Sequence, residues 1–458
     1  MYPAPCLARA VRASIFSTLA LVAAVCPGAW SVAADRQLTA LTVEEAITRA
    51  VTTDPGLQAQ YARWRAMTHT AVANAQLTDP TIRVSAGSVP IDSFDLAQEP
   101  MTQLLVGIEQ RLPRGKSLAL SAEEGEINIS AEQQRLRHRR LDIVRQVSHD
   151  WLALRSQHLI LSQLDSERRW LDEWVDLLSA HYRTASFATD QRSLISARIA
   201  LVRLHERRLH IEQNFEEVRH QLAQWLPGYY FDRPAEELML QLLSIEEVKS
   251  LLSLSDAALI DKLQGHPAFE LRGLALDKAS NAIALAEQAY GPAFALQASY
   301  GYRPEDPFGQ SRSDFVSVGV SFDVPLFTSK RQDQRLQARQ AEKVAAHNDR
   351  QMVFRSAIAE LRLALERWSR LHDRQKLFTS QLLPEIELQG HSVLAAYNQD
   401  KADVEQVVQA RMAEIDAHVD LIQLETQMLR AEVDARYWLS GEFGLETLIK
   451  SAAQEISR

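Results

Sequence analysis

The sequence predicts a mainly α-helical protein with a small β part, built from two copies of one structural plan. Two long stretches, 116–182 and 330–397, contain almost nothing that would stop a helix. Two shorter stretches, 80–113 and 292–325, instead alternate apolar and polar residues, as strands do. The 458 residues include only 16 Gly and 16 Pro, too few for a loop-rich all-β protein.

Landmarks recur at an almost constant distance along the chain, which predicts an internal duplication. Five pairs of matching segments are separated by 212 or 213 residues. In the order given next, the separation is 212 residues for the first three pairs, as from Pro55 to Pro267, and 213 for the last two. The pairs are Asp54-Pro55 and His266-Pro267, Pro80 and Pro292, Pro113 and Pro325, Ala197-Arg198 and Ala410-Arg411, and Trp225-Leu226-Pro227-Gly228 and Trp438-Leu439-Ser440-Gly441. Five landmarks at one spacing are not expected by chance.

We therefore expect a repeat over 35–228, a linker over 229–255, a second repeat over 256–441 and a C-terminal tail over 442–458. Each repeat would hold a β-hairpin followed by a helical hairpin. The β-hairpins would span 80–112 and 292–325, and the helical hairpins 116–226 and 330–439. One helix over 256–290 would precede the second β-hairpin. A small helix is expected within the linker, at 245–254.

The first 34 residues resemble a signal peptide. Arg9 and Arg12 precede an apolar run over 13–25, and small residues follow at 31–34. Cleavage there would export the protein and remove two basic residues but no acidic one, so the net charge would fall from −9 to −11. An acidic chain is a poor candidate for nucleic-acid binding.

Cysteine usage agrees with this interpretation. Cys6 and Cys26 are the only cysteines, and both would be lost with the signal peptide, leaving no disulfide framework. An alternative is that Cys26 is a lipidated N-terminus, although Val25 stands before it where a small residue would be expected.

The predicted strands each place apolar side chains on one face. After the signal peptide there is no apolar run of eighteen residues, so strands would have to carry any passage through a membrane. The predicted lipid-facing residues are Ile82, Val84, Leu104, Val106, Ile108, Phe294, Leu296, Tyr300, Val316, Val318, Val320 and Phe322. Four strands cannot close a barrel, so the chain would have to oligomerise, giving eight strands with two copies or twelve with three. The alternative is two soluble β-layers packed on a helical bundle.

The helix lengths predict a side-by-side arrangement. Residues 116–182 would form a helix roughly 100 Å long, whereas 41–77 and 190–226 would each reach little over half that length. The two shorter helices stacked end to end would match the long one. A coiled-coil-like seam supports the packing of the long helix. Its residues are Val144, Val147, Trp151, Leu154, Leu161 and Leu164.

Three segments around the first hairpin carry a family resemblance: Leu-Thr-Asp-Pro-Thr-Ile at 77–82, Glu-Pro-Met-Thr-Gln at 99–103 and Glu-Gln-Arg-Leu-Pro-Arg-Gly-Lys at 109–116. With the duplicated plan, they resemble TolC-type outer-membrane factors, in particular the heavy-metal-efflux branch of CzcC-like and CusC-like proteins. The resemblance implies a homotrimer in the outer membrane of a Gram-negative bacterium. In it, a twelve-stranded β-barrel surrounded by outer-membrane lipid would join an α-helical periplasmic tunnel.

The resemblance also implies a function. Such proteins are passive exit ducts of tripartite efflux pumps, and a periplasmic adaptor (membrane fusion) protein connects them to an inner-membrane RND-type pump that supplies energy. The substrate implied by the branch is heavy-metal cations, and the phenotype is heavy-metal resistance. No cofactor is implied.

The family's helix-turn tips, which meet the adaptor, carry the pattern Tyr-x-x-Gly-x-x-Ser followed by an Ala-Arg or Ala-Gln step. The corresponding residues in the second repeat are Tyr397, Asp400, Asp403, Ala410 and Arg411, and those in the first are Tyr182, Ala185, Ala188, Ala197 and Arg198. Some members form a cation-sensitive ring of carboxylates where this chain has Gln406 and Gln409. Asp400, Asp403 and Glu405 are nearby, so the sequence does not decide whether this chain has an acidic gate. The alternative is that these are ordinary turn and cap residues.

The sequence contains no motif for catalysis, so we predict that the protein is not an enzyme. His205, His210 and His220 share a predicted helix, but their spacing does not place metal ligands on one face. The alternative function is that of a periplasmic coiled-coil scaffold or adaptor protein that never enters a membrane.

Overall fold

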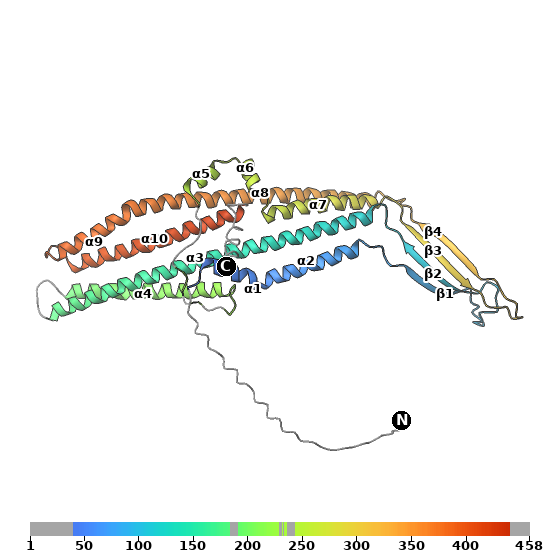
Figure 1. Ribbon diagram of the computed structural model, residues 1–458, viewed down its shortest axis with the longest axis horizontal. Coiled ribbons are helices and arrows are strands. Elements are labelled where there is room, and N and C mark those ends of the chain that lie inside the picture. The colour runs from blue at the N-terminus through green and yellow to red at the C-terminus, as the bar shows by residue number, and fades with distance from the viewer. Residues whose placement is uncertain (1–39, 184–190, 229–230, 232, 236–242, 440–458) are drawn as a thin grey trace, which may run out of the picture. The chain divides into compact units, whose positions relative to one another are not determined.

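Long helices lie side by side, and a four-stranded sheet continues from one end of them (Figure 1). The computed structural model describes residues 40–183, 191–228, 231, 233–235 and 243–439, which all belong to the unit Ala40–Arg458. The signal-peptide prediction lies outside these residues. The prediction of a mainly helical chain with a small β part is confirmed.

The described part of the first repeat contains four helices: α1 (Val43–Thr53), α2 (Pro55–Asn74), α3 (Ser117–Arg183) and α4 (Gln191–Ala223). The 67-residue α3 is unbroken, and both α2 and α4 pack along it, as the helix lengths predicted. Asp54 separates α1 from α2 and caps the latter: its carboxylate accepts a 2.6 Å hydrogen bond from the backbone N–H of Leu57. Pro55 follows at the first helical position, where its missing N–H costs nothing.

The second repeat has the same order with more breaks. Its elements are α5 (Ile245–Ser253), α6 (Asp256–Leu263), α7 (Pro267–Gln288), α8 (Gln332–Leu377), the π-helical turn η1 (Phe378–Leu382), α9 (Leu383–Tyr397) and α10 (Val404–Trp438). The stretch 256–290, predicted as one helix, divides at Gly265, whose positive φ of 91° ends α6. The stretch 330–397 was also predicted as one helix. It contains the π turn because Pro384 lacks an N–H and its ring crowds the carbonyl of residue 380.

Two apolar cores hold the helices together. One surrounds Trp151, a fully buried residue of α3 whose indole donates a 2.9 Å hydrogen bond to the carbonyl of Leu41. The other joins α3, α4 and α10 near the helix tips. α10 packs against both α8 and α3. Nearer the sheet, α7 also packs against α8 and α3. Of the predicted seam residues of α3, all but the partly buried Leu161 are fully buried.

The sheet joins the two repeats. Its antiparallel strands β1 (Thr81–Gly87), β2 (Gln103–Arg111), β3 (Phe294–Tyr302) and β4 (Phe315–Phe322) follow chain order, so β2 and β3 pair across the repeat boundary. Among the described residues, β1 and β4 have no strand partner on their outer edges. None of the described helices combines the length and the apolar character needed to cross a membrane.

Candidate functional site: the sheet and the helix tips

One face of the sheet is apolar across all four strands. Residues paired directly across neighbouring strands share a face, and one such row contains Val84, Val106, Tyr300 and Val316. The next row contains Ile82, Ile108, Ala298 and Val318. By the same register, all twelve residues predicted to face lipid lie on this face, and each of them is exposed.

The opposite face is made mainly of small and polar residues. Gly107, Ser299 and Ser317 form one row there. Leu105 and Phe315, which lie with Gly301 in another row, are large apolar residues on this face. A sheet with one largely apolar exposed face is unstable in water, so this face requires a cover. That the cover is lipid stays a prediction.

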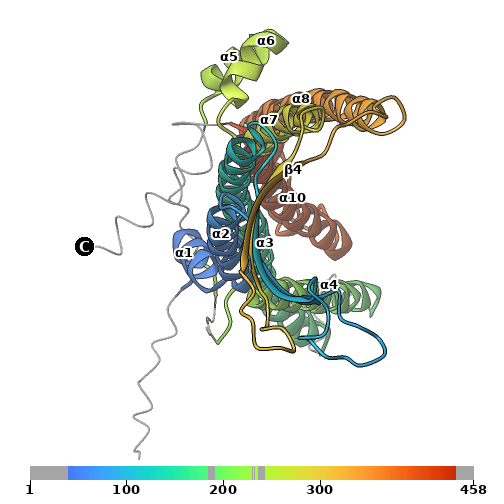
Figure 2. The ribbon, with the colours of Figure 1, turned by 90° about the vertical axis from the view of Figure 1, so that its right-hand side faces the viewer.

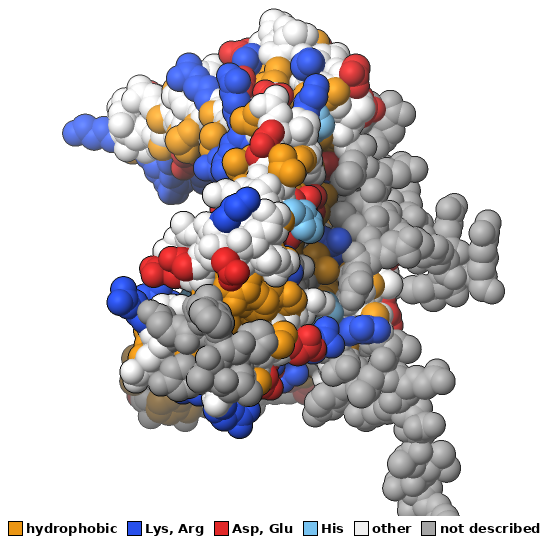
Figure 3. Space-filling model, turned by 90° about the vertical axis from the view of Figure 1, so that its left-hand side faces the viewer, with side chains coloured by type: hydrophobic (Ala, Val, Ile, Leu, Met, Phe, Trp, Pro, Cys, Tyr) orange, Lys and Arg blue, Asp and Glu red, His pale blue; other side chains and the backbone are white. Residues whose placement is uncertain are grey.

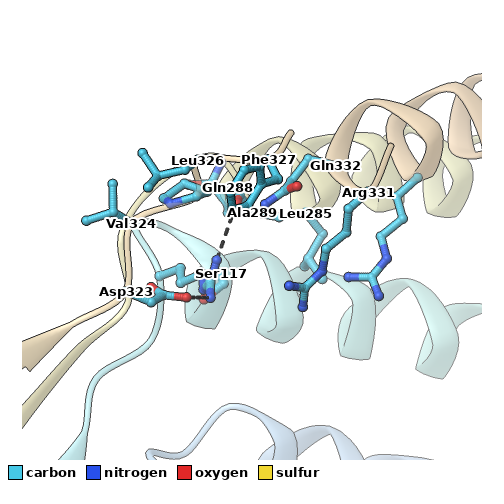
Figure 4. A pocket seen from close by; sticks show the side chains of 13 residues that line it. Ser117, Leu285, Gln288, Ala289, Asp323, Val324, Leu326, Phe327, Arg331 and Gln332 are labelled. Carbon is cyan, nitrogen blue, oxygen red and sulfur yellow. Dashed lines mark hydrogen bonds and ion pairs between the residues drawn. The ribbon is translucent and has the colours of Figure 1, made fainter. Parts of the chain in front are cut away.

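The sheet is fixed to the helices by contacts between the two strand-to-helix connections. Arg114, which follows β2, makes an ion pair with Asp323, which follows β4, and donates a 3.3 Å hydrogen bond to the carbonyl of Ala289. Asp323 also accepts a 2.6 Å hydrogen bond from the backbone N–H of Ala293. In Figure 4, dashed lines join Asp323 and the region of Ala289 to one side chain between them. These residues line a cavity of about 440 Å³. The Arg-Gly-Lys segment singled out in the sequence therefore joins the two repeats.

The α9–α10 tip explains why Asp replaces the Gly and the Ser of the family pattern. Asp400 has a φ of 58°, in the left-handed region that Gly prefers and that Asp tolerates better than most residues. Asp403 is the N-cap of α10: its carboxylate accepts a 2.9 Å hydrogen bond from the N–H of Gln406, whose side chain accepts one of 3.1 Å from the N–H of Asp403.

An aromatic cluster anchors this tip to α3. The ring of Tyr397 meets Trp174 edge-on at 5.3 Å between centroids, and Trp174 stacks on Trp170 at 5.6 Å. The guanidinium of Arg411 lies 5.2 Å from the centroid of Trp170. Burial, with a smaller contribution from the Asp400 carboxylate, raises the pKa of Tyr397. The second tip is thus packed against the first repeat.

Two ion pairs add to this anchor. Arg411 of α10 reaches Glu167 of α3 at 2.7 Å, where the glutamate side chain is only 8% exposed. Asp416 of α10 makes an ion pair with Arg207 of α4. Because α3 and α4 belong to the first repeat and α10 to the second, both pairs hold the two helical hairpins together.

The other predicted tip residues are less constrained. Gln409 donates a 3.3 Å hydrogen bond to Glu405, and Gln406 is part of the capping box, so both glutamines are engaged locally. Arg198 is exposed on α4. Of the first tip, Ala185, Ala188 and the side chain of Tyr182 lie outside the described residues.

Sequence reasoning missed Glu167, Trp170 and Trp174. The two tryptophans are four residues apart and therefore share a helix face, a signal that was available. The partnership of Glu167 with Arg411 could not be found in this way, because it joins residues 244 positions apart. In the described ranges, no group of three or more His, Cys, Asp or Glu side chains could hold a metal ion.

Comparisons with known proteins agree with the fold. Residues 260–436 match the family model described as outer membrane efflux protein. The structure of CusC resembles this chain with a TM-score of 0.73 and 15% identity, covering 87% of this chain and 92% of that one. The Campylobacter jejuni outer-membrane channel CmeC has a TM-score of 0.71 and 12% identity, covering 90% and 89%.

The open state of the Neisseria gonorrhoeae outer-membrane channel MtrE has a TM-score of 0.70 and 15% identity, covering 88% and 89%. The search of curated proteins gives no match. The predicted fold class is therefore confirmed as the one these outer-membrane channels share. The match to the outer membrane efflux protein model supports the predicted location in the outer membrane.

Proposed function

We propose that this chain is the subunit of a passive outer-membrane exit duct of an efflux pump. The observation that carries the proposal is the sheet: one continuous apolar face and two unpaired edges, joined to long helical hairpins. In lipid each unpaired backbone group costs several kcal/mol, so further copies of the chain must pair with the β1 and β4 edges. Three copies, as the family resemblance implies, would close a barrel of about twelve strands.

The periplasmic scaffold is the competing function, and the sheet argues against it. A coiled-coil scaffold has no use for an exposed apolar sheet face. Fractionation tests the choice: the full chain should sediment with outer membranes and need detergent for extraction. Extracted particles should show a barrel at one end of a helical tube. A protein recovered from the periplasm without detergent would favour the scaffold.

We also propose that the helix tips form the gate, which widens when an adaptor protein docks. Support comes from the ties between the repeats, because the second tip can separate from α3 and α4 only if the pairs of Arg411 with Glu167 and of Arg207 with Asp416 break. Together with the tip aromatics, these pairs would stabilise the closed arrangement. Docking of an adaptor, driven by its own contacts, would offset their loss.

Single-channel recording tests the gate. Combining Arg411→Gln with Asp416→Asn should raise the open fraction or the conductance in planar bilayers. The matched control is Arg208→Gln, which removes ion pairs with Asp165 at 2.7 Å and Glu212 at 2.9 Å, all within the first repeat. Equal effects of both changes would mean that the ties between repeats do not gate the duct.

The narrower proposal for the substrate is heavy-metal cations, which rests on the family resemblance and on CusC as one structural neighbour. The neighbours CmeC and MtrE have similar scores and do not favour that branch. Deleting the gene and comparing sensitivity to metal salts with sensitivity to organic toxicants separates the possibilities. Unchanged metal tolerance in the deletion strain would remove the heavy-metal form of the proposal and leave the duct itself intact.

A further inference from the structure

A cleft with four arginines lies between α8, α10 and α3. Its volume is about 620 Å³, and its lining includes Arg367, Arg370 and Arg374 from α8 and Arg430 from α10. Two carboxylates, Glu366 and Asp434, also line it. The three α8 arginines are spaced by three and four residues, so they share one helix face.

The cleft opens on the inner side of the curved helical layer. In Figure 2, α8, α3 and α4 follow an arc, α10 lies on its inner side, and α5 and α6 lie outside it. On α10, Glu432 accepts a 2.9 Å hydrogen bond from the N–H of Leu243, just before α5, and so points outward. Arg430 and Asp434 are two residues to either side of Glu432, about 200° around the helix, and point inward.

The same reasoning places the α8 arginines. Arg362 binds Asp256 of α6 and therefore points outward. Arg367 and Arg374 follow it by five and twelve residues, which turns them roughly 120–140° away from α6. Figure 3, which faces the tips, shows Lys and Arg side chains gathered chiefly in the upper part of the molecule, where α8 and α9 lie.

These arginines are not neutralised by the chain itself. In the part of the chain that the structure describes, Arg367, Arg370 and Arg374 make no ion pair and no side-chain hydrogen bond, and all three are exposed. Asp434 is already shared between Arg145 and His149, each at 2.9 Å. Its pKa is lowered by those two partners even though burial opposes the shift. The two carboxylates that line the cleft therefore do not balance its four arginines, and the cleft has an excess of positive charge.

Arg430 adds a donor inside the cleft. One of its terminal nitrogens donates a 3.2 Å hydrogen bond to the carbonyl of His149, which holds the side chain in place. Its Nε is buried and has no hydrogen-bond partner among the described residues. Burial lowers the pKa of Arg430, and the nearby carboxylates of Asp150 and Asp434 oppose that shift without cancelling it.

We propose that this arginine cleft is an anion-binding site on the lumen side of the duct, and that it favours solutes bearing carboxylate, phosphate or sulfonate groups. Guanidinium groups bind such groups through paired, charge-assisted hydrogen bonds. The proposal rests on the proposed duct function and narrows its substrate class. It competes with the heavy-metal prediction, because a free divalent cation would be repelled at this position.

Sodium tripolyphosphate is a suitable probe because it is a small, multiply charged anion. Its effect on the thermal unfolding midpoint of the detergent-solubilised full chain should be compared with that of sodium chloride at equal ionic strength. Tripolyphosphate should raise the midpoint of the wild type, and the shift should disappear in Arg367→Gln/Arg374→Gln. A charge-matched control, Lys249→Gln/Arg355→Gln, removes two exposed cations outside the cleft and should keep the shift.

Planar-bilayer currents give a second readout. Tripolyphosphate should block the wild-type channel at a concentration about tenfold lower than it blocks the cleft variant. Arg367→Lys/Arg374→Lys keeps the charge and should retain most of the block, which separates a charge effect from misfolding.

Equal midpoint shifts in the cleft variant and its control would overturn the proposal. So would an absent shift in the wild type, the result expected if carboxylates of a second copy already fill the cleft. A protein that shows the midpoint shift but forms no channel would contradict the duct function and leave the anion site standing.

Discussion

The two repeats place equivalent residues in different surroundings. Asp54 and His266 both cap the helix that leads to the sheet, and a proline follows each. Asp54 is ion-paired with Arg139 at 3.0 Å. His266 instead lies among Phe269, Tyr437 and Trp438, and its Nδ1 accepts a 3.2 Å hydrogen bond from the N–H of Ala268. The two halves therefore share the backbone plan at this position, whereas the chemistry of their caps differs.

The long helices differ in the same way. α3 runs without a break to the first tip, whereas the second-repeat helix is interrupted by a π turn before Pro384. The second tip is anchored on α3 by Tyr397 and Arg411. The continuous helix therefore serves as the support, and the interrupted one carries the part that a gate could move.

The two repeats should respond equally to a charge placed on the apolar face of the sheet. Such substitutions should have the largest effect on membrane assembly. Val106→Arg in the first repeat and Val318→Arg in the second should each disfavour membrane assembly by about 2–4 kcal/mol, because both place a charge on the apolar face. The fraction of oligomer extracted from outer membranes measures this. Ser317→Arg, on the opposite face, is the control and should cost much less. Unequal effects of the two valine changes would mean that one repeat does not face lipid.

The two helix caps, Asp54 and His266, should differ in how they make the stability of the protein depend on pH. Burial first, then the nearby charges of His138 and Arg137, lowers the pKa of His266 from 6.5 to about 3. The unfolded state therefore binds the proton more tightly between those values, and stability falls as the pH drops below 6.5. Between pH 7.5 and pH 5 this residue should cost about 2 kcal/mol of unfolding free energy.

Comparing the wild type with His266→Asn measures the contribution of His266 to this loss of stability, because Asn keeps a hydrogen-bond acceptor at the cap and does not titrate. Chemical denaturation of the detergent-solubilised chain at several pH values measures the difference. The variant should be less stable at pH 7.5 but lose about 2 kcal/mol less on acidification. Parallel pH profiles for the two proteins would show that His266 is not the sensitive group.

The fold could be predicted largely from the sequence because its signals are local. The alternation of Phe294–Tyr302 and the prolines that end helices each act within a few residues, and the nearly constant offset shows that the same local signals occur twice. The breaks at Gly265 and before Pro384 were missed although their signals, a glycine and a proline inside stretches predicted as single helices, are present in the sequence. The site depended on contacts distant in sequence, such as Glu167 with Arg411 and Arg114 with Asp323, which local patterns cannot reveal.

The cap of α10 gives a smaller effect. Asp403→Ala removes the acceptor for the N–H of Gln406 and should destabilise the helix by about 1 kcal/mol. Asp403→Ser keeps an acceptor and should restore most of that loss. Hydrogen exchange of the first turn of α10 measures the change locally. Identical exchange in both variants would mean that the aromatic anchor, rather than the cap, holds this end of the helix.

The smallest expected change in stability is at Asp400, three residues after the end of α9. The N–H of Lys401 donates a 2.9 Å hydrogen bond to the carbonyl of Ala396, and that of Asp400 donates one of 3.0 Å to Tyr397, which together form a Schellman motif. Its left-handed residue is Asp400, so Asp400→Gly should stabilise the tip by about 0.5 kcal/mol. Asp400→Val, which places a β-branched residue at this φ, should destabilise it by about 1 kcal/mol. If both changes lower the unfolding midpoint, the carboxylate itself contributes to the tip, and the charge near Tyr397 matters more than the backbone conformation.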